Sequence, residues 1–188
     1  MLVSIKKQKM SHPNLFIETE RLLIRPFKLE DIEPSYLMNL DAEVSQYTGD
    51  GGIVSKKEIE RRIVENVFGD YKKHGFGRLA VELKGADKFI GFTGLKYLED
   101  LEEVDLGYRF MKEYWGNGIA TESGKACLDL GFNKLGLKRM IAMVLPENKN
   151  SIHVLEKLNF EFEKEMIEDG LLVKVYALTK ENAVINLK

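Results

Sequence analysis

The stretch Val104-Asp-Leu-Gly-Tyr-Arg-Phe110 is followed directly by Met111-Lys-Glu-Tyr-Trp-Gly-Asn-Gly-Ile-Ala120, and a helical pattern begins at Thr121. We interpret the first segment as a β-strand and the two glycines as a turn that leads into a helix. A helix that starts after glycines presents unpaired backbone N–H groups and the positive end of its dipole, which suits a phosphate or pyrophosphate group. The sequence therefore predicts an anion site, and with it a candidate cofactor site, at this turn.

Length and composition restrict the class of protein. The 188 residues fit one domain, and 44% hydrophobic with 31% charged residues is typical of a soluble globular chain. A net charge of −2 argues against nucleic acid as a partner. The single cysteine, Cys127, excludes an intrachain disulfide framework and lies in a predicted helix, where we expect it to be inert core.

We do not expect a targeting segment in the N-terminal region. Ser11-His-Pro-Asn14 stands where a signal peptide needs an apolar run, and the chain has no run of about 18 apolar residues that would cross a membrane. We expect a cytoplasmic protein that does not bind membranes. Residues 1–14 would form a flexible arm and residues 15–188 the domain, while Met10 is an alternative start that the sequence leaves open.

Hydrophobic periodicity and turn residues divide the chain into strands and helices. We expect a bent strand or a hairpin at 15–27, and strands at 78–83, 89–97, 103–110, 140–144, 161–166 and 171–178. We expect helices at 29–40, 55–75, 121–135 and 148–158. The Ser55-Lys-Lys-Glu58 capping box and the Gly75 stop bound the clearest helix. This order predicts one α+β domain with a mixed, mostly antiparallel sheet of about seven strands flanked by about four helices.

Two common nucleotide-binding motifs do not fit the glycine turn. Thr121 occupies the place of the third glycine in the dinucleotide fingerprint, and the strands before it are not a βαβ unit. No Gly-Lys-Ser or Gly-Lys-Thr follows the turn, so the P-loop pattern is also missing. By itself the turn is compatible with an ordinary strand-to-helix connection as well as with an anion site.

Three further stretches extend the pattern. They are Thr19-Glu-Arg-Leu-Leu-Ile-Arg-Pro-Phe27, Asp105-Leu-Gly-Tyr108 and Asn148-Lys-Asn-Ser-Ile-His-Val-Leu-Glu-Lys-Leu-Asn-Phe160. Together with Trp115-Gly-Asn-Gly-Ile-Ala120 they resemble the Gcn5-related N-acetyltransferase (GNAT) superfamily, and within it the ribosomal-protein-alanine acetyltransferase (RimJ/RimL-like) branch. The resemblance spans nearly the whole chain. It implies a single GNAT-like domain, acetyl-CoA as cosubstrate without a metal, and a V-shaped splay between the fourth and fifth strands.

The resemblance also implies where acetyl-CoA binds. The pantetheine amides would pair with the backbone of the fourth strand at Leu106, Gly107, Tyr108, Arg109 and Phe110. The pyrophosphate would contact the backbone of the turn at Gly116, Asn117, Gly118, Ile119 and Ala120. Trp115 departs from the Arg or Gln of the superfamily, so we expect packing and a backbone contact from it. Asn148 matches the CoA-contacting asparagine of the family, and a plain helix cap is the alternative.

Direct acetyl transfer also needs groups that move protons. The resemblance places Asp105 at the position of the base, and Glu103 lies two residues earlier on the same strand face; a pair of solvated carboxylates is the alternative. Leu155 stands where many relatives carry the tyrosine that protonates the thiolate, so Ser151, near the expected sulfur, is the substitute. The backbone N–H of Tyr108 is the expected donor to the thioester carbonyl.

The acceptor side of the site is less defined. Tyr47, Thr48 and Asp50 lie in a loop that relatives use near the acceptor, and plain loop residues are the alternative. We expect acetyl-CoA-dependent transfer to a primary amine, such as a protein N-terminal amine. A small amine (polyamine, aminoglycoside or amino acid) and a non-catalytic CoA-binding sensor are the alternatives. Acceptor identity, acyl-chain preference and homodimer formation through edge strands stay open.

Overall fold

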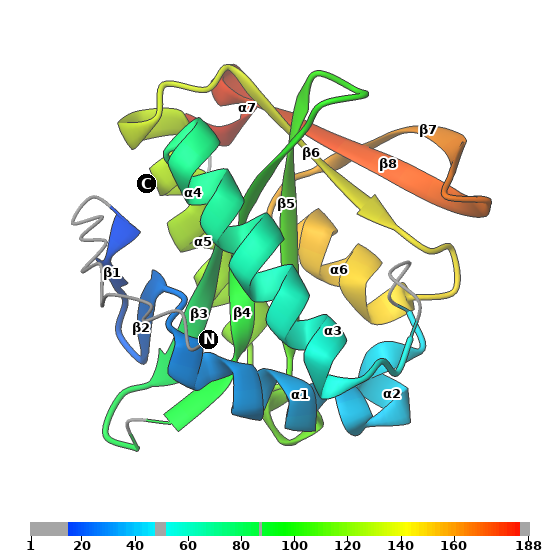
Figure 1. Cartoon of the computed structure of the whole chain (residues 1–188). Coiled ribbons are helices and arrows are strands. Elements are labelled where there is room, and N and C mark those ends of the chain that lie inside the picture. Colours follow the sequence, from blue (N-terminus) through cyan, green and yellow to red (C-terminus); the bar gives the residue numbers. More distant parts are fainter. Residues whose placement is uncertain (1–14, 48–51, 87, 185–188) are drawn as a thin grey trace.

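A central sheet organises the computed structural model, which describes residues 15–47, 52–86 and 88–184 (Figure 1). The sheet has eight strands in the order β1-β2-β3-β4-β5-β6-β8-β7. All neighbouring strands are antiparallel except β5 and β6. The predicted α+β fold with a mixed, mostly antiparallel sheet is confirmed. The expected arm at 1–14, as well as Thr48 and Asp50, lies outside the described residues.

The strands follow the sequence predictions closely. They are β1 (Ile17–Glu18), β2 (Leu22–Pro26), β3 (Arg78–Leu83), β4 (Lys88–Leu98), β5 (Glu103–Phe110), β6 (Arg139–Val144), β7 (Glu161–Glu168) and β8 (Leu171–Thr179). The sheet has one strand more than the expected seven because the segment 15–27 folds as the hairpin, the second of the two predicted alternatives, with Ile17 opposite Ile24. The first of them has only two residues, which is too short to show a period.

Helices cover both faces of the sheet (Figure 1). They are α1 (Ile32–Leu40), α2 (Ala42–Ser45), α3 (Lys56–Arg61), α4 (Phe68–His74), α5 (Ile119–Asp129), α6 (Lys149–Lys157) and α7 (Lys180–Val184). Helices α1, α3 and α4 lie on one face, and α5 packs with α6 on the other. Helices α2 and α7 were not predicted, since four or five residues carry no readable periodicity.

Helices α3 and α4 form one continuous rod that is joined by a π-helical segment at Arg62–Val67. The Oγ atom of Ser55 accepts a hydrogen bond from the backbone N–H of Glu58 at 3.2 Å, and Gly75 ends the rod with a φ of 77°. Both ends were predicted, but the π segment was not. The four-residue spacing of the apolar side chains in the sequence is compatible with either kind of turn, so it does not reveal the π segment. A π-helical turn is wider than an α-helical one and therefore rotates the face that α4 presents to the sheet.

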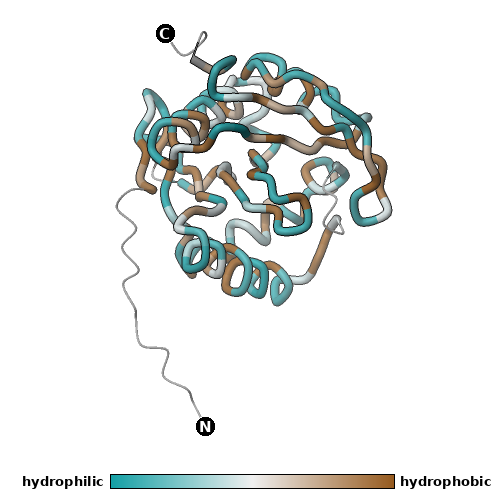
Figure 2. The backbone as a smooth tube through the Cα atoms, turned by 90° about the horizontal axis from the view of Figure 1, so that it is seen from above, coloured by the Kyte–Doolittle hydropathy of each residue, from teal (hydrophilic) through white to brown (hydrophobic). Residues whose placement is uncertain are grey.

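The core consists of two hydrophobic clusters. The larger cluster includes Leu95, Cys127 and Leu155, and the smaller one, which includes Met38 and Ile59, lies beneath α1 and α3. The outer loops are largely hydrophilic when the molecule is seen from above (Figure 2). Burial raises the pKa of the Cys127 thiol to about 11, which fits the expected inert role of this cysteine.

Candidate active site

Strands β5 and β6 separate in the middle of the sheet. Strand β5 pairs with β4 along its whole length, but it is in register with the parallel strand β6 only where Asp105 lies opposite Ile141. Past Asp105, the backbone groups of residues 106–110 that point toward β6 have no ladder partner in the described part of the chain. An open strand edge of this kind can pair with an extended amide chain. The expected V-shaped splay is therefore present.

The glycine turn leads directly into the first residue of α5. Gly116 and Gly118 have φ angles of 74° and 76°, in the left-handed region that favours glycine. Gly118 occupies the N-cap position of α5 and provides no side-chain cap, so the N–H groups of the first helical turn are left for a ligand. The helix starts at Ile119, two residues before the predicted start. This geometry suits an anion, as the sequence predicted.

Trp115 fixes the turn to the end of β5. Its indole N–H donates a hydrogen bond to the carbonyl oxygen of Phe110 at 2.8 Å, while 39% of the residue stays exposed. The side-chain amide of Asn117 donates to the carbonyl oxygen of Trp115 at 3.2 Å. The side chains of Trp115 and Asn117 thus hold the glycine turn on the side that faces the end of β5.

Arg21 holds the turn on the other side, and the sequence interpretation missed this residue. Its Nε atom lies 2.6 Å from Oε2 of Glu122 in α5, and its Nη1 atom donates to the carbonyl oxygen of Asn117 at 2.9 Å. Thr19 donates to the same carboxylate. The Thr19-Glu-Arg21 segment could have revealed this contact, because its Thr19 and Arg21 side chains bind Glu122, the glutamate that ends the turn motif. A guanidinium next to an anion site is a second candidate phosphate contact.

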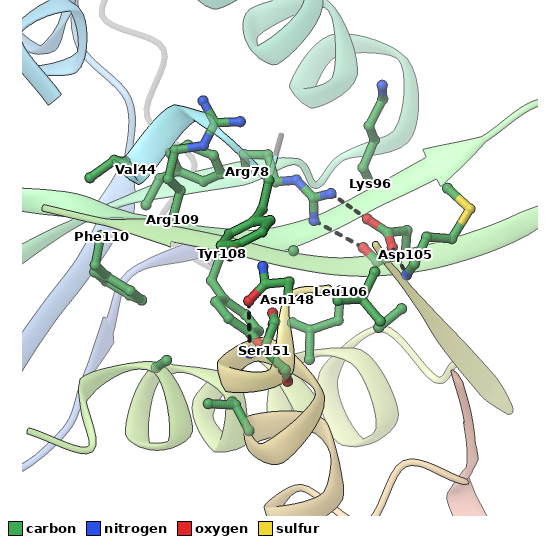
Figure 3. A pocket seen from close by; sticks show the side chains of 18 of the residues that line it. Val44, Arg78, Lys96, Asp105, Leu106, Tyr108, Arg109, Phe110, Asn148 and Ser151 are labelled. Carbon is green, nitrogen blue, oxygen red and sulfur yellow. Dashed lines mark hydrogen bonds and ion pairs between the residues drawn. The ribbon is translucent and has the colours of Figure 1, made fainter. Parts of the chain in front are cut away.

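A pair of hydroxyl groups bridges β5 and α6 (Figure 3). The phenol oxygen of Tyr108 lies 2.9 Å from Oγ of Ser151 and 3.2 Å from the carbonyl oxygen of Ser151. Burial raises the pKa of Tyr108 to about 12, so the phenol stays protonated at neutral pH. Leu155, at the position of the tyrosine in many relatives, is buried in the core. Tyr108 thus brings a phenol beside Ser151 from the strand, which sequence reasoning missed.

Asn148 caps α6 with its side-chain oxygen. Oδ1 accepts a hydrogen bond from the backbone N–H of Ser151 at 3.1 Å. The amide nitrogen of Asn148 makes no hydrogen bond to the described residues and stays available in the cavity. The cap and a ligand contact are therefore compatible with each other.

Asp105 is tied to the sheet by two partners (Figure 3). It is buried and forms an ion pair with Arg78, whose side chain crosses Gly94 and Gly107 on neighbouring strands. Its other oxygen accepts a hydrogen bond from the backbone N–H of Met143 at 3.2 Å, across the gap between β5 and β6. A carboxylate engaged in this way has few lone pairs left for a substrate proton.

Glu103 lies away from the cavity. Its Oε1 atom accepts a hydrogen bond from Nε of Arg139 at 2.8 Å, and Arg139 also pairs with Glu163 at 2.7 Å. Glu103 and Asn117 are not among the described residues that line the cavity, whereas Asp105, Asn148 and Ser151 are. The two predicted carboxylates therefore do not share one site.

One cavity of about 880 Å³ brings most of the predicted residues together. Its walls come from β5, the glycine turn, β6 and α6 on one side and from α1, α3 and α4 on the other. Tyr47 lies at its edge and is 37% exposed. The lining is mixed, because apolar side chains such as Met38 and Phe92 alternate with charged ones such as Arg109 and Asp70. The cavity can hold an extended cosubstrate and a second reactant at once.

Two further observations concern the described residues alone. None of the helices formed by residues 15–47, 52–86 and 88–184 is long and apolar enough to cross a membrane. Within the same residues, no group of three or more His, Cys, Asp or Glu side chains could hold a metal ion.

Comparison with known proteins places the chain in a family. The model of the acetyltransferase (GNAT) domain matches residues 21–161. Bacillus subtilis YkkB is 31% identical over 163 residues, which are 84% of this chain and 92% of YkkB. The uncharacterized N-acetyltransferase YnaD of B. subtilis is 31% identical over 160 residues, 83% of this chain and 90% of YnaD. The spermidine N(1)-acetyltransferase of Escherichia coli K12 is 26% identical over 150 residues, 78% of this chain and 76% of the enzyme.

Solved structures share the fold. A GNAT-family acetyltransferase from Bacillus anthracis superposes with a TM-score of 0.77 at 27% identity, over 88% of this chain and 99% of that one. The ribosomal-protein-S5-alanine acetyltransferase of Vibrio fischeri superposes with a TM-score of 0.71 at 20% identity, over 89% of this chain and 97% of that one. The resemblance to the ribosomal-protein acetyltransferase branch thus extends to the fold. The chain belongs to the GNAT acetyltransferase family and is an N-acetyltransferase.

Proposed function

We propose that this enzyme transfers the acetyl group of acetyl-CoA directly to a primary amine. One observation carries the proposal. The open edge of β5, the glycine turn and the Ser151 hydroxyl line the same cavity as α1, α3 and α4 on the opposite face of the sheet. A thioester held along β5 and an amine arriving from the helical side can therefore meet without either crossing the sheet.

Acetyl-CoA is assigned to the splay and the turn. The pantetheine chain would add to residues 106–110 as a short extra strand, using the backbone groups that lack a ladder partner. The pyrophosphate would lie at the N-terminus of α5, against the backbone from Gly116 to Ala120, with the Arg21 guanidinium beside it. The free amide nitrogen of Asn148 would donate to the pantetheine or to the phosphates.

The leaving thiolate is assigned to the hydroxyl pair. The Ser151 hydroxyl would give a proton to the sulfur as the C–S bond breaks, and the neighbouring Tyr108 phenol would orient that hydroxyl. The backbone N–H of Tyr108 would donate to the thioester carbonyl oxygen as charge develops on it. Leu155 contributes only packing in this scheme.

We assign Asp105 a positioning role in place of the catalytic base that the sequence suggested. Its contacts with Arg78 and Met143 join β5 and β6 at the point from which the V opens. Glu103 would stabilise the same junction through Arg139, outside the cavity. Both carboxylates would thus shape the acetyl-CoA site without touching the amine.

Two classes of acceptor fall within the proposal. The relative from E. coli is named for spermidine, and the structural neighbour from V. fischeri for a ribosomal-protein alanine. We retain a protein N-terminal amine as the first candidate and a small amine as the second. Tyr47 lies at the edge of the cavity and would contact either one; the expected contacts of Thr48 and Asp50 stay predictions.

An acceptor screen tests the proposal. Release of free CoA from acetyl-CoA should depend on an amine in a panel of peptides with N-terminal Ser or Ala, spermidine, an aminoglycoside and free amino acids. Calorimetry of acetyl-CoA binding is run in parallel. Binding without amine-dependent release over the whole panel would favour the CoA-binding sensor and overturn acetyl transfer.

Two matched variants test the location of the cofactor. Gly118→Trp should abolish acetyl-CoA binding because it closes the turn. Gly136→Trp is the control, since Gly136 has a similar φ of 72° but lies beyond the π-helical segment Leu130–Lys134 that continues α5. Equal binding by the two variants would contradict the assignment of the turn.

A further inference from the structure

The proposed acetyl transfer still needs a group that accepts the proton of the amine. Few carboxylates in the cavity are free to do so. Those among its described lining residues are Glu43, Glu58, Asp70, Asp105, Glu168 and Asp169. Three of them are committed to ion pairs: Glu43 with Lys112, Glu58 with Arg61 and Arg62, and Asp105 with Arg78. Glu168 is the last residue of β7, and Asp169 belongs to the turn that follows it.

Asp70 differs from the three paired carboxylates by its lack of a partner among the described residues, and from Glu168 and Asp169 by its place on α4 beside the sheet. It is half-buried on α4, and its carboxylate makes no hydrogen bond or ion pair with the residues that the structure describes. The π-helical segment before α4 sets the rotation of this helix, which turns Asp70 inward with Ile63 and Val67. A π segment inside a helix is frequent at functional sites.

The position of Asp70 relative to β5 follows from the strand register. A Cβ atom placed on Gly77 would lie 3.2 Å from Cβ of Asp70, so this carboxylate stands beside the start of β3. The next residue, Arg78, is in register with Gly94, and Gly94 with Gly107. Asp70 and the face of β5 at Gly107 that the acceptor amine would approach therefore line one continuous surface. The Arg78 guanidinium lies between them.

This surface is opposite the hydroxyl pair. Alternate residues of a strand point to opposite faces, so Gly107 faces α4 while Tyr108 faces Ser151 on α6. An amine that approaches the thioester from the α4 side leaves the sulfur on the α6 side. The two proton transfers of the reaction would then occur at separate groups on the two faces of β5.

The environment of Asp70 makes its carboxylate a better proton acceptor than an exposed one. Burial raises the pKa of Asp70, and electrostatic interactions with Lys96 on β4, His74 and Lys73 on α4, and Arg78 on β3 oppose that shift in part. Asp105 on β5 faces the same surface, where Arg78 neutralises it. A carboxylate with a raised pKa holds a proton better while it stays ionised often enough to accept one.

We propose that Asp70 is the catalytic base that accepts the proton of the acceptor amine. The assignment rests on the proposed acetyl transfer. As the nitrogen of the neutral amine bonds to the carbonyl carbon, its N–H proton passes to Asp70 directly or through one water. The C–S bond then breaks, Ser151 gives its proton to the sulfur, and solvent restores the serine proton while Asp70 returns its own proton to solvent.

Substitution of Asp70 tests the assignment on the full chain with the best acceptor of the screen. Asp70→Asn should lower kcat by about 10²- to 10⁴-fold and remove the acidic limb of the pH profile of kcat/KM, because no group is left to deprotonate. Its calorimetric affinity for acetyl-CoA should stay within about twofold of wild type, which reports an intact cofactor site. Glu60→Gln, an exposed charge removal on the same helical rod, should leave kcat unchanged.

Chemical rescue keeps the test independent of folding defects. Sodium formate should restore a concentration-dependent part of the activity of Asp70→Ala and should not affect Glu60→Gln. A wild-type pH profile and kcat in Asp70→Asn, or the absence of formate rescue, would overturn the role of Asp70. Wild-type protein that releases no CoA with any amine would instead overturn the proposed acetyl transfer.

Discussion

The phenol oxygen of Tyr108 and the Oγ atom of Ser151 lie 2.9 Å apart and join strand β5 to helix α6 beside the splay. Both residues line the cavity, and the phenol is kept protonated by its burial. The contact gives this enzyme a tyrosine hydroxyl near the expected position of the thioester sulfur. Helix α6 itself carries Leu155 where many relatives have their tyrosine. The route of the thiolate proton can be tested directly.

Tyr108→Phe and Ser151→Ala should each lower kcat by about 10- to 100-fold, because each removes one hydroxyl of the proton path. Their effects should not add in the double variant if the two groups act as one unit. Steady-state kinetics with the best acceptor gives kcat, and calorimetry checks that acetyl-CoA still binds. Tyr176→Phe, outside the cavity lining, is the control. Additive losses would show that Ser151 acts without Tyr108.

Asp105→Asn should destabilise the fold by about 3 kcal/mol, because it leaves the largely buried Arg78 guanidinium, whose side chain is 17% exposed, without its anionic partner. Urea unfolding at neutral pH measures the free energy of unfolding. The same variant should weaken acetyl-CoA binding, since the start of the V loses its tie to Met143. Glu103→Gln, whose partner Arg139 is one-third exposed, should cost no more than about 1 kcal/mol. A stable Asp105→Asn variant that binds acetyl-CoA normally would contradict the positioning role.

Arg21→Met should raise the Kd for CoA about 10-fold, which corresponds to about 1.4 kcal/mol for a lost charge-assisted contact and a looser turn. Pantetheine, which lacks the pyrophosphate, should bind wild type and Arg21→Met equally. The pair of ligands separates a phosphate contact from a general defect. A parallel loss of affinity for both ligands would place the effect of Arg21 outside the pyrophosphate site.

Glu122 should make the stability of the protein depend on acidic pH. Burial disfavours its charged form, but hydrogen bonds from Thr19 and Arg21 outweigh this effect and lower its pKa below the ordinary value. A lowered folded-state pKa gives stability that is present above the unfolded value of about 4.3 and disappears as the pH falls through the folded one. Glu122→Gln should therefore be less stable than wild type at pH 7, by no more than about 1 kcal/mol because Arg21 is partly exposed.

Urea unfolding at several pH values measures this dependence. The difference between wild type and Glu122→Gln should shrink as the pH falls below about 4. Glu60→Gln, on an exposed helix face, should show no such trend. A constant difference at all pH values would mean that the ionisation of Glu122 does not stabilise the turn.

Short-range sequence patterns predicted most of the helices and strands. They could not predict contacts between residues far apart in the sequence. The Ser55 cap, the Gly75 stop and the strand at residues 103–110 were correct because each depends on neighbours within a few residues. The π-helical turn at Arg62–Val67 leaves the apolar spacing unchanged, so the inward rotation of Asp70 carries no sequence signal.

The site shows the same limit. The turn and the splay followed from motifs, and the strand pattern correctly placed Asp105 on a face of β5. Periodicity gives the face of a side chain but not its partner, and Arg78 comes from a strand 27 residues earlier. The contact between Arg21 and Glu122 spans 101 residues and was equally hidden. Sequence reasoning therefore identified most residues of the cavity wall formed by β5, the glycine turn and α6, and it assigned the base to a residue that is already engaged.

The crossing of Arg78 over Gly107 also constrains how this enzyme can change over generations. A Cβ atom on Gly107 would lie 2.5 Å from Cζ of Arg78, which the ion pair with Asp105 holds in place. Any larger residue at 107 is harmful while that arginine remains, and becomes tolerable only after the arginine has been lost. Loss of Arg78 alone would in turn leave the buried Asp105 carboxylate without its partner. Positions 78, 105 and 107 should therefore change together rather than one at a time.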